Sequence, residues 1–216
     1  LVLGGELYLP PGPGPFPAVL YNHGSAPGML HSEASAAIGP RFTERGWAFF
    51  MPYRRGQGLS ADQGPYIMDE IMAAEEQRSA GAEVLVQLHR TDHLQDQLAG
   101  ARWLRSQSFI DGSRLATFGN SFGGIQVVLG MTPGGYCAGI DAAGASMSWG
   151  DAPDLQQLLI TEATRSPKPL FFFQAANDYD LAPSKALSAA MDGAERTFKL
   201  IIYPPFGSTQ REGHSF

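Results

Sequence analysis

Several features are scarce in this sequence, and each scarcity excludes a class of protein. The 216 residues include one cysteine, Cys137, so the chain can form neither an internal disulfide nor a cysteine-built metal site. Charged residues make up only 17%, and the formal net charge of −6 argues against nucleic acid as a partner. The longest apolar runs, such as 47–51, have the length of strands. None approaches the roughly 18 residues of a membrane span, so we expect no membrane association.

What the chain does contain is typical of one globular domain. Apolar residues make up 44%, which is enough to bury a core, and the 26 glycines and 16 prolines make the chain rich in turns. Because domains commonly have about 100–200 residues, we expect a single domain over 1–216. The chain begins at Leu1 rather than Met. We therefore expect a processed chain or a fragment, in which a targeting segment would not be visible, and we assign it to the cytoplasm.

Short apolar runs alternate with longer amphipathic ones along the chain. The apolar runs predict strands at 2–9, 18–21, 47–51, 114–118, 138–141, 169–174 and 197–203. The amphipathic runs predict helices at 41–45, 67–88, 92–105, 122–131 and 183–191. Pro40 would lie in the first turn of helix 41–45 and Gly46 would end it. The alternation predicts an α/β fold with a mostly parallel sheet and helices on both faces.

The segment 119–124, Gly-Asn-Ser-Phe-Gly-Gly, carries the strongest chemical signal. It follows a predicted strand, precedes a predicted helix and matches G-x-S-x-G, the nucleophile elbow. A serine at so sharp a turn has a strained backbone, and side chains two residues away on either side would clash. Gly119 and Gly123 remove those side chains. The turn is therefore expected to present the Ser121 hydroxyl at the N-terminus of a helix, where negative charge is stabilised.

A serine hydroxyl needs a general base, and the base needs a group that orients it. The elbow predicts the chain order serine, acid, histidine. His214 is the one histidine that follows Ser121 in the sequence. Asp178 and Asp180 both lie in the loop after the strand 169–174. Asp178 is closer to the end of that strand and is preferred, while Asp180 is better suited to begin the next helix.

An oxyanion hole needs two N–H donors, and the sequence indicates where both should lie. One is the N–H of Phe122, the residue after the nucleophile. The other is assigned to the N–H of Ser25, in the loop after the strand that ends at Asn22, with Gly24 or Ala26 as alternatives. His23 precedes the serine in the sequence, so it is interpreted as a structural residue of this turn.

These residues together resemble the α/β-hydrolase superfamily, and within it the dienelactone hydrolase-like group, which grades into the prolyl-oligopeptidase-like peptidases. The matching segments are 22–25, 53–60, 119–124, 177–183 and 213–214. Dienelactone hydrolases proper use a cysteine nucleophile, so Ser121 favours ordinary ester cleavage over lactone chemistry. The family normally has a closing helix after the histidine, whereas two residues follow His214 here. We therefore expect either a fragment or a weakly anchored histidine loop.

Two further patterns suggest cofactor or metal binding but lack the context that each requires. Residues 56–61 fit G-x-G-x-x-A, a dinucleotide fingerprint, yet Gly64-Pro65 would break the helix that this motif needs. His89 and His93 are four residues apart, but the glutamate of H-E-x-x-H is missing, and they are interpreted as surface histidines. We therefore predict no cofactor and no metal.

The sequence thus predicts a serine hydrolase that cleaves small-molecule carboxylic esters through an acyl-enzyme intermediate. The segment 63–88 is predicted to form a small helical excursion over the active site. Two alternatives stay open: a serine peptidase related to prolyl oligopeptidase, and a binding module that keeps the fold without strong catalysis.

Overall fold

Seven strands form one sheet in the computed structural model, which describes residues 1–25, 33–76 and 81–215. Their order is β1-β3-β2-β4-β5-β6-β7. The bounds are β1 (Gly5–Tyr8), β2 (Phe16–Asn22), β3 (Ala48–Pro52), β4 (Ile110–Asn120), β5 (Gly139–Ala142), β6 (Leu170–Ala175) and β7 (Phe198–Tyr203). Only β1 runs antiparallel to its neighbour, so the mostly parallel sheet predicted from the sequence is confirmed.

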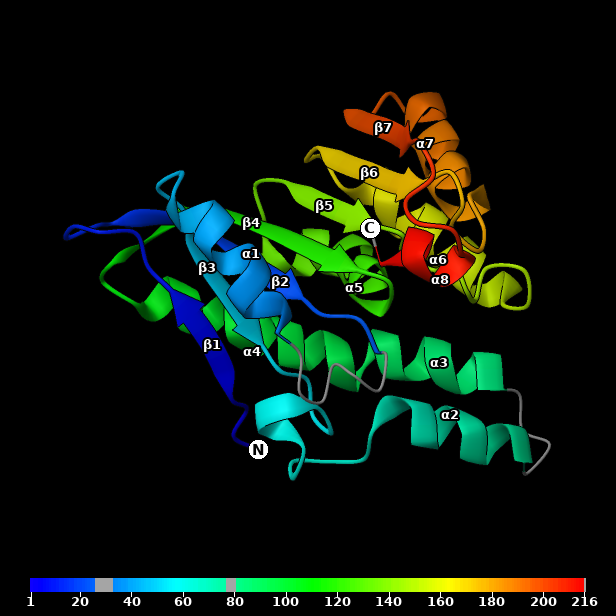
Figure 1. The fold of residues 1–216 in the computed structure, drawn as a ribbon, viewed down its shortest axis with the longest axis horizontal. Helices are drawn as coiled ribbons and strands as arrows, with labels where there is room; N and C mark the ends of the chain where they lie inside the picture. The colour runs from blue at the N-terminus through cyan, green and yellow to red at the C-terminus, as the bar shows by residue number, and fades with distance from the viewer. Residues whose placement is uncertain (26–32, 77–80, 216) are drawn as a thin grey trace.

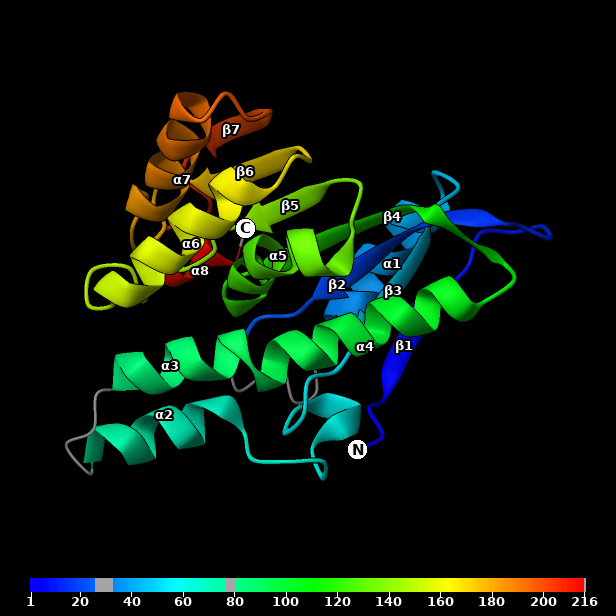
Figure 2. The same ribbon diagram turned by 180° about the vertical axis from the view of Figure 1, so that it is seen from behind.

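Helices cover both faces of this sheet. Their bounds are α1 (Ala34–Thr43), α2 (Ile67–Glu76), α3 (Gly81–Arg90), α4 (Asp92–Ser106), α5 (Phe122–Gly134), α6 (Pro153–Arg165), α7 (Ala182–Gly193) and α8 (Gln210–His214), with a 3₁₀ turn η2 (Gly58–Ser60). Figure 1 shows α1 in front of the strands, and Figure 2, seen from behind, shows α4, α5 and α6 on the opposite face. Among the described residues, no helix combines the length and apolar character needed to cross a membrane.

Two buried clusters follow from the alternation of side chains along the strands. On β2, Leu20 belongs to the larger cluster, which helices α2 to α7 complete, while Val19 and Tyr21 belong to the smaller cluster under α1. Fully burying one such side chain stabilises the fold by about 1.5–3 kcal/mol. The sheet is thereby held rigid from both sides, and the residues at the ends of its strands keep fixed positions.

Two predicted helices differ from those observed. Helix α1 begins at Ala34, so Pro40 lies inside it rather than in its first turn. The helical ladder resumes after this proline, because the N–H of Glu44 donates to the Pro40 carbonyl at 2.9 Å. The segment predicted as one helix over 67–88 contains two, α2 and α3. Gly81 is the first residue of α3, and residues 77–80 between the two helices lie outside the described residues.

The sequence interpretation also missed α6 and α8. Helix α6 has Pro153 in its first turn and buries Leu155, Leu159 and Ala163 at four-residue intervals, so its pattern was present in the sequence. Helix α8 has only five residues, Gln210–His214, too few to show a periodic pattern.

Candidate active site

Ser121 lies at the junction of β4 and α5, in the strained conformation expected for a nucleophile elbow. Its φ of 57° and ψ of −120° are unusual for a residue other than glycine. A Cβ at Gly119 would meet the carbonyl of Gly123, and a Cβ at Gly123 would meet the carbonyl of Asn22. Only glycine fits at these two positions, as the motif predicted, so the turn stays tight and Ser121 stays at its apex.

The structure brings Ser121, His214 and Asp178 into one hydrogen-bonded line. Nε2 of His214 lies 2.9 Å from Oγ of Ser121, and Nδ1 of His214 lies 2.8 Å from Oδ1 of Asp178. Because a carboxylate can only accept, Nδ1 carries the proton and Nε2 is left to accept from the serine hydroxyl. This is the arrangement in which an imidazole can remove the serine proton.

Asp178 is held by several donors besides His214. Its Oδ1 accepts from the Ser146 hydroxyl at 2.7 Å and from the N–H of Tyr179 at 2.6 Å, and its Oδ2 accepts from Nε2 of Gln174 at 2.7 Å. Burial alone would raise the pKa of this carboxyl. The hydrogen bonds from His214, Gln174 and Ser146 outweigh burial and lower the pKa below its ordinary value. Asp178 is therefore ionised at neutral pH and keeps a fixed orientation.

Asp180, the alternative acid, lies elsewhere. Its Oδ1 accepts from the N–H of Ala182 at 2.8 Å, at the start of α7. Its own N–H donates to Oγ of Ser146 at 3.1 Å. Asp180 thus occupies the helix-start position that the sequence suggested for it, and the structure places Asp178 against His214.

The histidine loop is tied to the acid loop. Nδ2 of Asn177 donates to the carbonyls of Phe206 and Thr209, both at 2.9 Å. Thr209 and Glu212 form a capping box at the start of α8, which lies near the ends of β5 and β6 (Figure 1). These contacts hold the short helix that carries His214 in place. The structure therefore does not have the weakly anchored histidine loop that was considered from the sequence.

The two expected oxyanion donors flank the nucleophile. Phe122 is the first residue of α5, where an N–H has no acceptor within the helix. A Cβ at Gly24 would lie 3.5 Å from Cβ of Ser121, so the Gly24–Ser25 peptide runs beside the serine. The carbonyl of Ser25 accepts from the hydroxyl of Tyr66, just before α2. The alternative donor Ala26 lies outside the described residues.

The segment 63–88, predicted as an excursion over the active site, contacts the loop of Ser25 through residues at the start of α2. Besides the Tyr66 contact, the sulfur of Met68 lies 3.8 Å from Oγ of Ser25. Figures 1 and 2 show α2 and α3 as a pair that runs side by side along one edge of the molecule. The start of α2 thus lies against the loop that carries one of the expected oxyanion donors.

His23 is a buried part of this loop. Its Nε2 accepts from the N–H of Arg54 at 3.2 Å, so Nδ1 carries the proton and donates to the carbonyl of Gly24 at 2.8 Å. Burial, and next the positive charge of Arg54, lower the pKa of His23 well below its ordinary value. His23 is therefore neutral, and both of its ring nitrogens are hydrogen-bonded, which is consistent with a structural role.

His89 and His93 are buried rather than exposed, which corrects the sequence interpretation. Both side chains are 0% exposed, and Nε2 of Gln126 lies 2.6 Å from Nδ1 of His89. His89 lies near the end of α3 and His93 near the start of α4, so the four-residue spacing spans a junction between two helices. In the described part of the chain, no group of three or more potential ligands could hold a metal ion.

Asp141, on β5, is a buried carboxyl close behind the elbow. Its Oδ1 accepts from the N–H of Gly144 at 2.8 Å, and burial raises its pKa from 3.8 to about 7. Its side chain fits because Gly124 and Gly144 have no Cβ; a Cβ at either would meet this carboxyl. It is not in contact with Ser121, His214 or Asp178, so its ionisation bears on stability.

We expect Asp141→Asn to stabilise the protein increasingly as pH rises. Between its unfolded pKa of 3.8 and its folded pKa of about 7, only the folded state keeps the proton, so wild-type stability falls through this window. Asparagine cannot ionise and can still accept from Gly144, so the gain should approach ~4 kcal/mol above neutral pH. Denaturant unfolding at about pH 5 and pH 8 measures it. An equal change in the free energy of unfolding at both pH values would contradict this prediction. So would the same pH-dependent gain in Asp151→Asn, since Asp151 is exposed.

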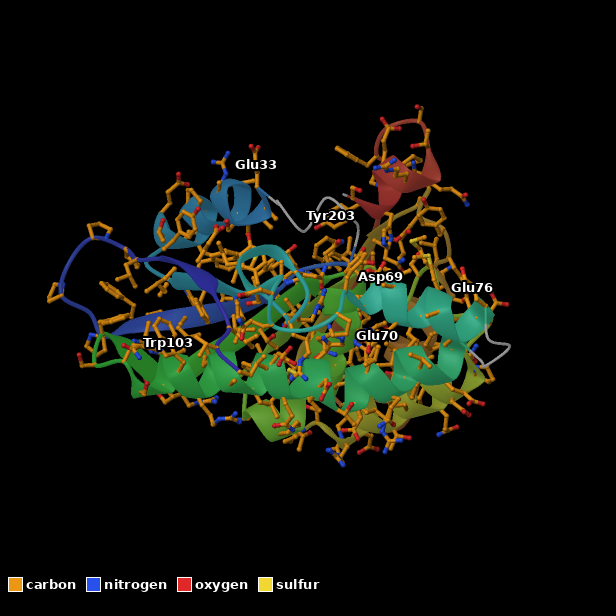
Figure 3. The ribbon with its side chains drawn as sticks, turned by 90° about the horizontal axis from the view of Figure 1, so that it is seen from below. Glu33, Asp69, Glu70, Glu76, Trp103 and Tyr203 are labelled. Atoms are coloured by element: carbon orange, nitrogen blue, oxygen red, sulfur yellow. The ribbon has the colours of Figure 1, made fainter. Side chains whose placement is uncertain are left out.

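A cavity of about 560 Å³ lies away from these residues, between β1 and α4. Trp103, labelled in Figure 3, lines it from α4 and packs against Phe50 in a tilted arrangement, with 4.7 Å between ring centroids. None of Ser121, Asp178 and His214 lines this cavity. The chemistry of the site is thus defined by the hydrogen-bonded line at the strand ends and not by this cavity.

The sequence profile of the prolyl oligopeptidase family matches residues 82–214, more than half of the chain. The matched range contains Ser121, Asp178 and His214. Comparison with curated protein sequences gave no match.

Similar solved structures include both peptidases and esterases of the α/β-hydrolase fold. An acylaminoacyl peptidase of Pyrococcus horikoshii is 18% identical with a TM-score of 0.67, and the match covers 99% of this chain and 36% of that one. Est1E of Butyrivibrio proteoclasticus, solved with ferulic acid bound, is 16% identical with a TM-score of 0.69, covering 98% and 88%. An acetyl xylan esterase of Paenibacillus sp. R4 is 16% identical with a TM-score of 0.63, covering 95% and 75%. This chain spans about a third, 32% to 36%, of the first peptidase structures matched.

Proposed function

The chain is a serine hydrolase of the prolyl oligopeptidase family, and from this premise we propose that it cleaves carboxylic esters of small molecules. The observation that carries the proposal is the bridging position of His214, 2.9 Å from the Ser121 hydroxyl and 2.8 Å from the Asp178 carboxylate. These are hydrogen-bond distances, within which a proton can be transferred.

In the proposed mechanism, His214 takes the proton of Ser121 as Oγ attacks the ester carbonyl carbon. The N–H groups of Phe122 and Ser25 donate to the oxyanion of the tetrahedral intermediate. Asp178 keeps the imidazole oriented and stabilises its charged form. His214 then gives the proton to the departing alkoxide, and the acyl group stays on Ser121. Water attacks the acyl-enzyme in the same way, releasing the acid and restoring the serine.

Esterases among the similar structures support an ester substrate. Est1E and the acetyl xylan esterase share this fold with TM-scores of 0.69 and 0.63. Peptide cleavage is the second candidate, because the family match and several structural neighbours are peptidases. Ester and peptide cleavage would use the same three residues. The two reactions differ in the leaving group, which is an alcohol for an ester and an amine for a peptide.

A matched pair of substrates tests the proposal. We expect p-nitrophenyl butyrate to be hydrolysed with a kcat/KM at least about 10³-fold above that of butyryl p-nitroanilide, a difference of about 4 kcal/mol in barrier. A blocked dipeptide p-nitroanilide should likewise be a poor substrate. Turnover of the dipeptide amide within about tenfold of the ester would instead assign the chain to the peptidases.

A further inference from the structure

Arg54, which none of the proposed steps uses, is buried against the oxyanion loop, residues 23–25, which carries the expected donor Ser25. The residue is only 5% exposed, and its Nη2 donates to the carbonyl of Gly24 at 2.7 Å. Gln57 holds the guanidinium in place, since its Oε1 accepts from Nε at 3.1 Å and from Nη2 at 3.0 Å. The Gly24 carbonyl also accepts from Nδ1 of His23. Two strong donors therefore fix the direction of one carbonyl.

Fixing that carbonyl also fixes the N–H of the next residue. In a trans peptide the carbonyl of one residue and the N–H of the next point in opposite directions in one plane. The carbonyl of Gly24 points toward Arg54, so the N–H of Ser25 points away from Arg54. Gly24 lies beside Ser121, because a Cβ added at Gly24 would lie 3.5 Å from Cβ of Ser121. A carbonyl that accepts strong hydrogen bonds also polarises its peptide, so the N–H becomes a better donor.

Among the residues that the structure describes, no carboxylate forms an ion pair with Arg54. Asp96 is the acid whose charge acts on Arg54, and Oδ1 of Asp96 is bound by Nη2 of Arg55 at 2.7 Å. The buried histidines around Arg54 are neutral, because burial and neighbouring positive charge lower their pKa values: His23, His89 and His93. Burial lowers the pKa of Arg54 itself to about 10, so it stays a cation at neutral pH.

We propose that Arg54 is a positioning residue of the oxyanion hole, which aims the Ser25 N–H and places a positive charge behind the developing oxyanion. This inference rests on the proposed function. It adds to that function a buried cation that acts through the Gly24–Ser25 peptide and does not touch the substrate. Preorganised dipoles and charges in a water-excluded site are a large source of transition-state stabilisation.

The test compares Arg54→Met with Arg54→Lys. For p-nitrophenyl butyrate, Arg54→Met should lower kcat about 10²-fold and change KM less than about threefold, because the contact matters mainly in the transition state. Affinity for a butyl trifluoromethyl ketone, whose adduct with Ser121 carries an oxyanion, should fall by a similar factor of about 10². Arg54→Lys keeps the charge and should recover about tenfold of the lost kcat. Arg105→Met, which removes an exposed arginine at the far end of α4, is the matched control.

Several results would overturn the inference. One is a folded Arg54→Met enzyme whose kcat lies within about threefold of wild type. Another is a rise in KM with kcat unchanged. A third is an affinity for the ketone that falls by no larger factor than the change in KM. If Arg54→Met does not fold, Arg54→Lys decides: we expect kcat about tenfold below wild type with KM unchanged, and full kcat refutes the role.

A fluorophosphonate separates failure of this inference from failure of the proposed function. Its reaction with Ser121 also places negative charge on an oxygen in the hole, whether the natural substrate is an ester or an amide. A wild-type protein that does not react with the fluorophosphonate would refute the proposed function itself. If the wild-type protein reacts and the Arg54→Met variant reacts equally fast, only the role of Arg54 is refuted.

Discussion

Ser121→Ala will lower kcat for p-nitrophenyl butyrate by on the order of 10⁶-fold, the loss known for removing the nucleophile of a serine protease triad. The loss is so large because no other hydroxyl lies within reach of Nε2 of His214, at least among the residues that the structure describes. Without Oγ no acyl-enzyme can form, and what remains is weak assistance to water from the oxyanion donors. Steady-state kinetics with the ester, together with fluorophosphonate labelling, measures both consequences.

The substitution should leave the fold intact. Alanine at position 121 must accept the same positive φ of 57°, and this chain already holds Ala143 at 59° and Ala145 at 61°. The thermal unfolding midpoint should therefore stay close to that of wild type. Ser215→Ala is the matched control, since that hydroxyl is exposed and donates to the carbonyl of Arg211. Ester turnover that survives in Ser121→Ala, or labelling that persists, would show that another residue is the nucleophile.

The parts of the site that sequence reasoning could find are those set by local backbone and chain order. The glycines at 119 and 123 follow from the closeness of the elbow to neighbouring carbonyls, which any serine at so sharp a turn imposes. The positions of Asp178 and His214 follow from the ends of parallel strands, because these all reach one edge of the sheet. The structure places His214 within hydrogen-bond distance of Ser121, and Asp178 within hydrogen-bond distance of His214.

The supporting contacts depend on tertiary packing that no local pattern encodes. Ser146 reaches Asp178 only because β5 and β6 are adjacent in the sheet, which places the loops after them side by side. Gln174 carried a weak signal, as the one polar side chain within the apolar run 170–175. His89 and His93 were misjudged because their burial depends on two helices meeting at Thr91 and packing against α5. Chain order and local motifs therefore point to candidate reacting groups, whereas the groups that hold them depend on tertiary packing.

Asp178→Asn will lower kcat for the ester by about 10⁴-fold, the loss known for the matching change in a serine protease triad. The carboxylate accepts four hydrogen bonds and donates none: from His214, Ser146 and the Tyr179 N–H at Oδ1, and from Gln174 at Oδ2. An asparagine amide must turn its NH₂ toward one of these donors. Facing His214, it would force the proton onto Nε2, where the imidazole can no longer accept from Ser121. Facing Gln174, it would set two donors against each other, and in either case the imidazolium loses its negative partner.

Asp180→Asn is the matched control for this prediction. Asp180 uses Oδ1 to accept from the N–H of Ala182, and an asparagine carbonyl oxygen makes the same bond. Its kcat should stay within about twofold of wild type, as expected for a change that preserves its hydrogen bond. Both variants should show normal KM in the fraction that is folded, because neither side chain is expected to touch the substrate. If Asp180→Asn were the crippled enzyme and Asp178→Asn the active one, the acid of the triad would have to be reassigned to Asp180, and the line from Asp178 through His214 to Ser121 would be structural rather than catalytic.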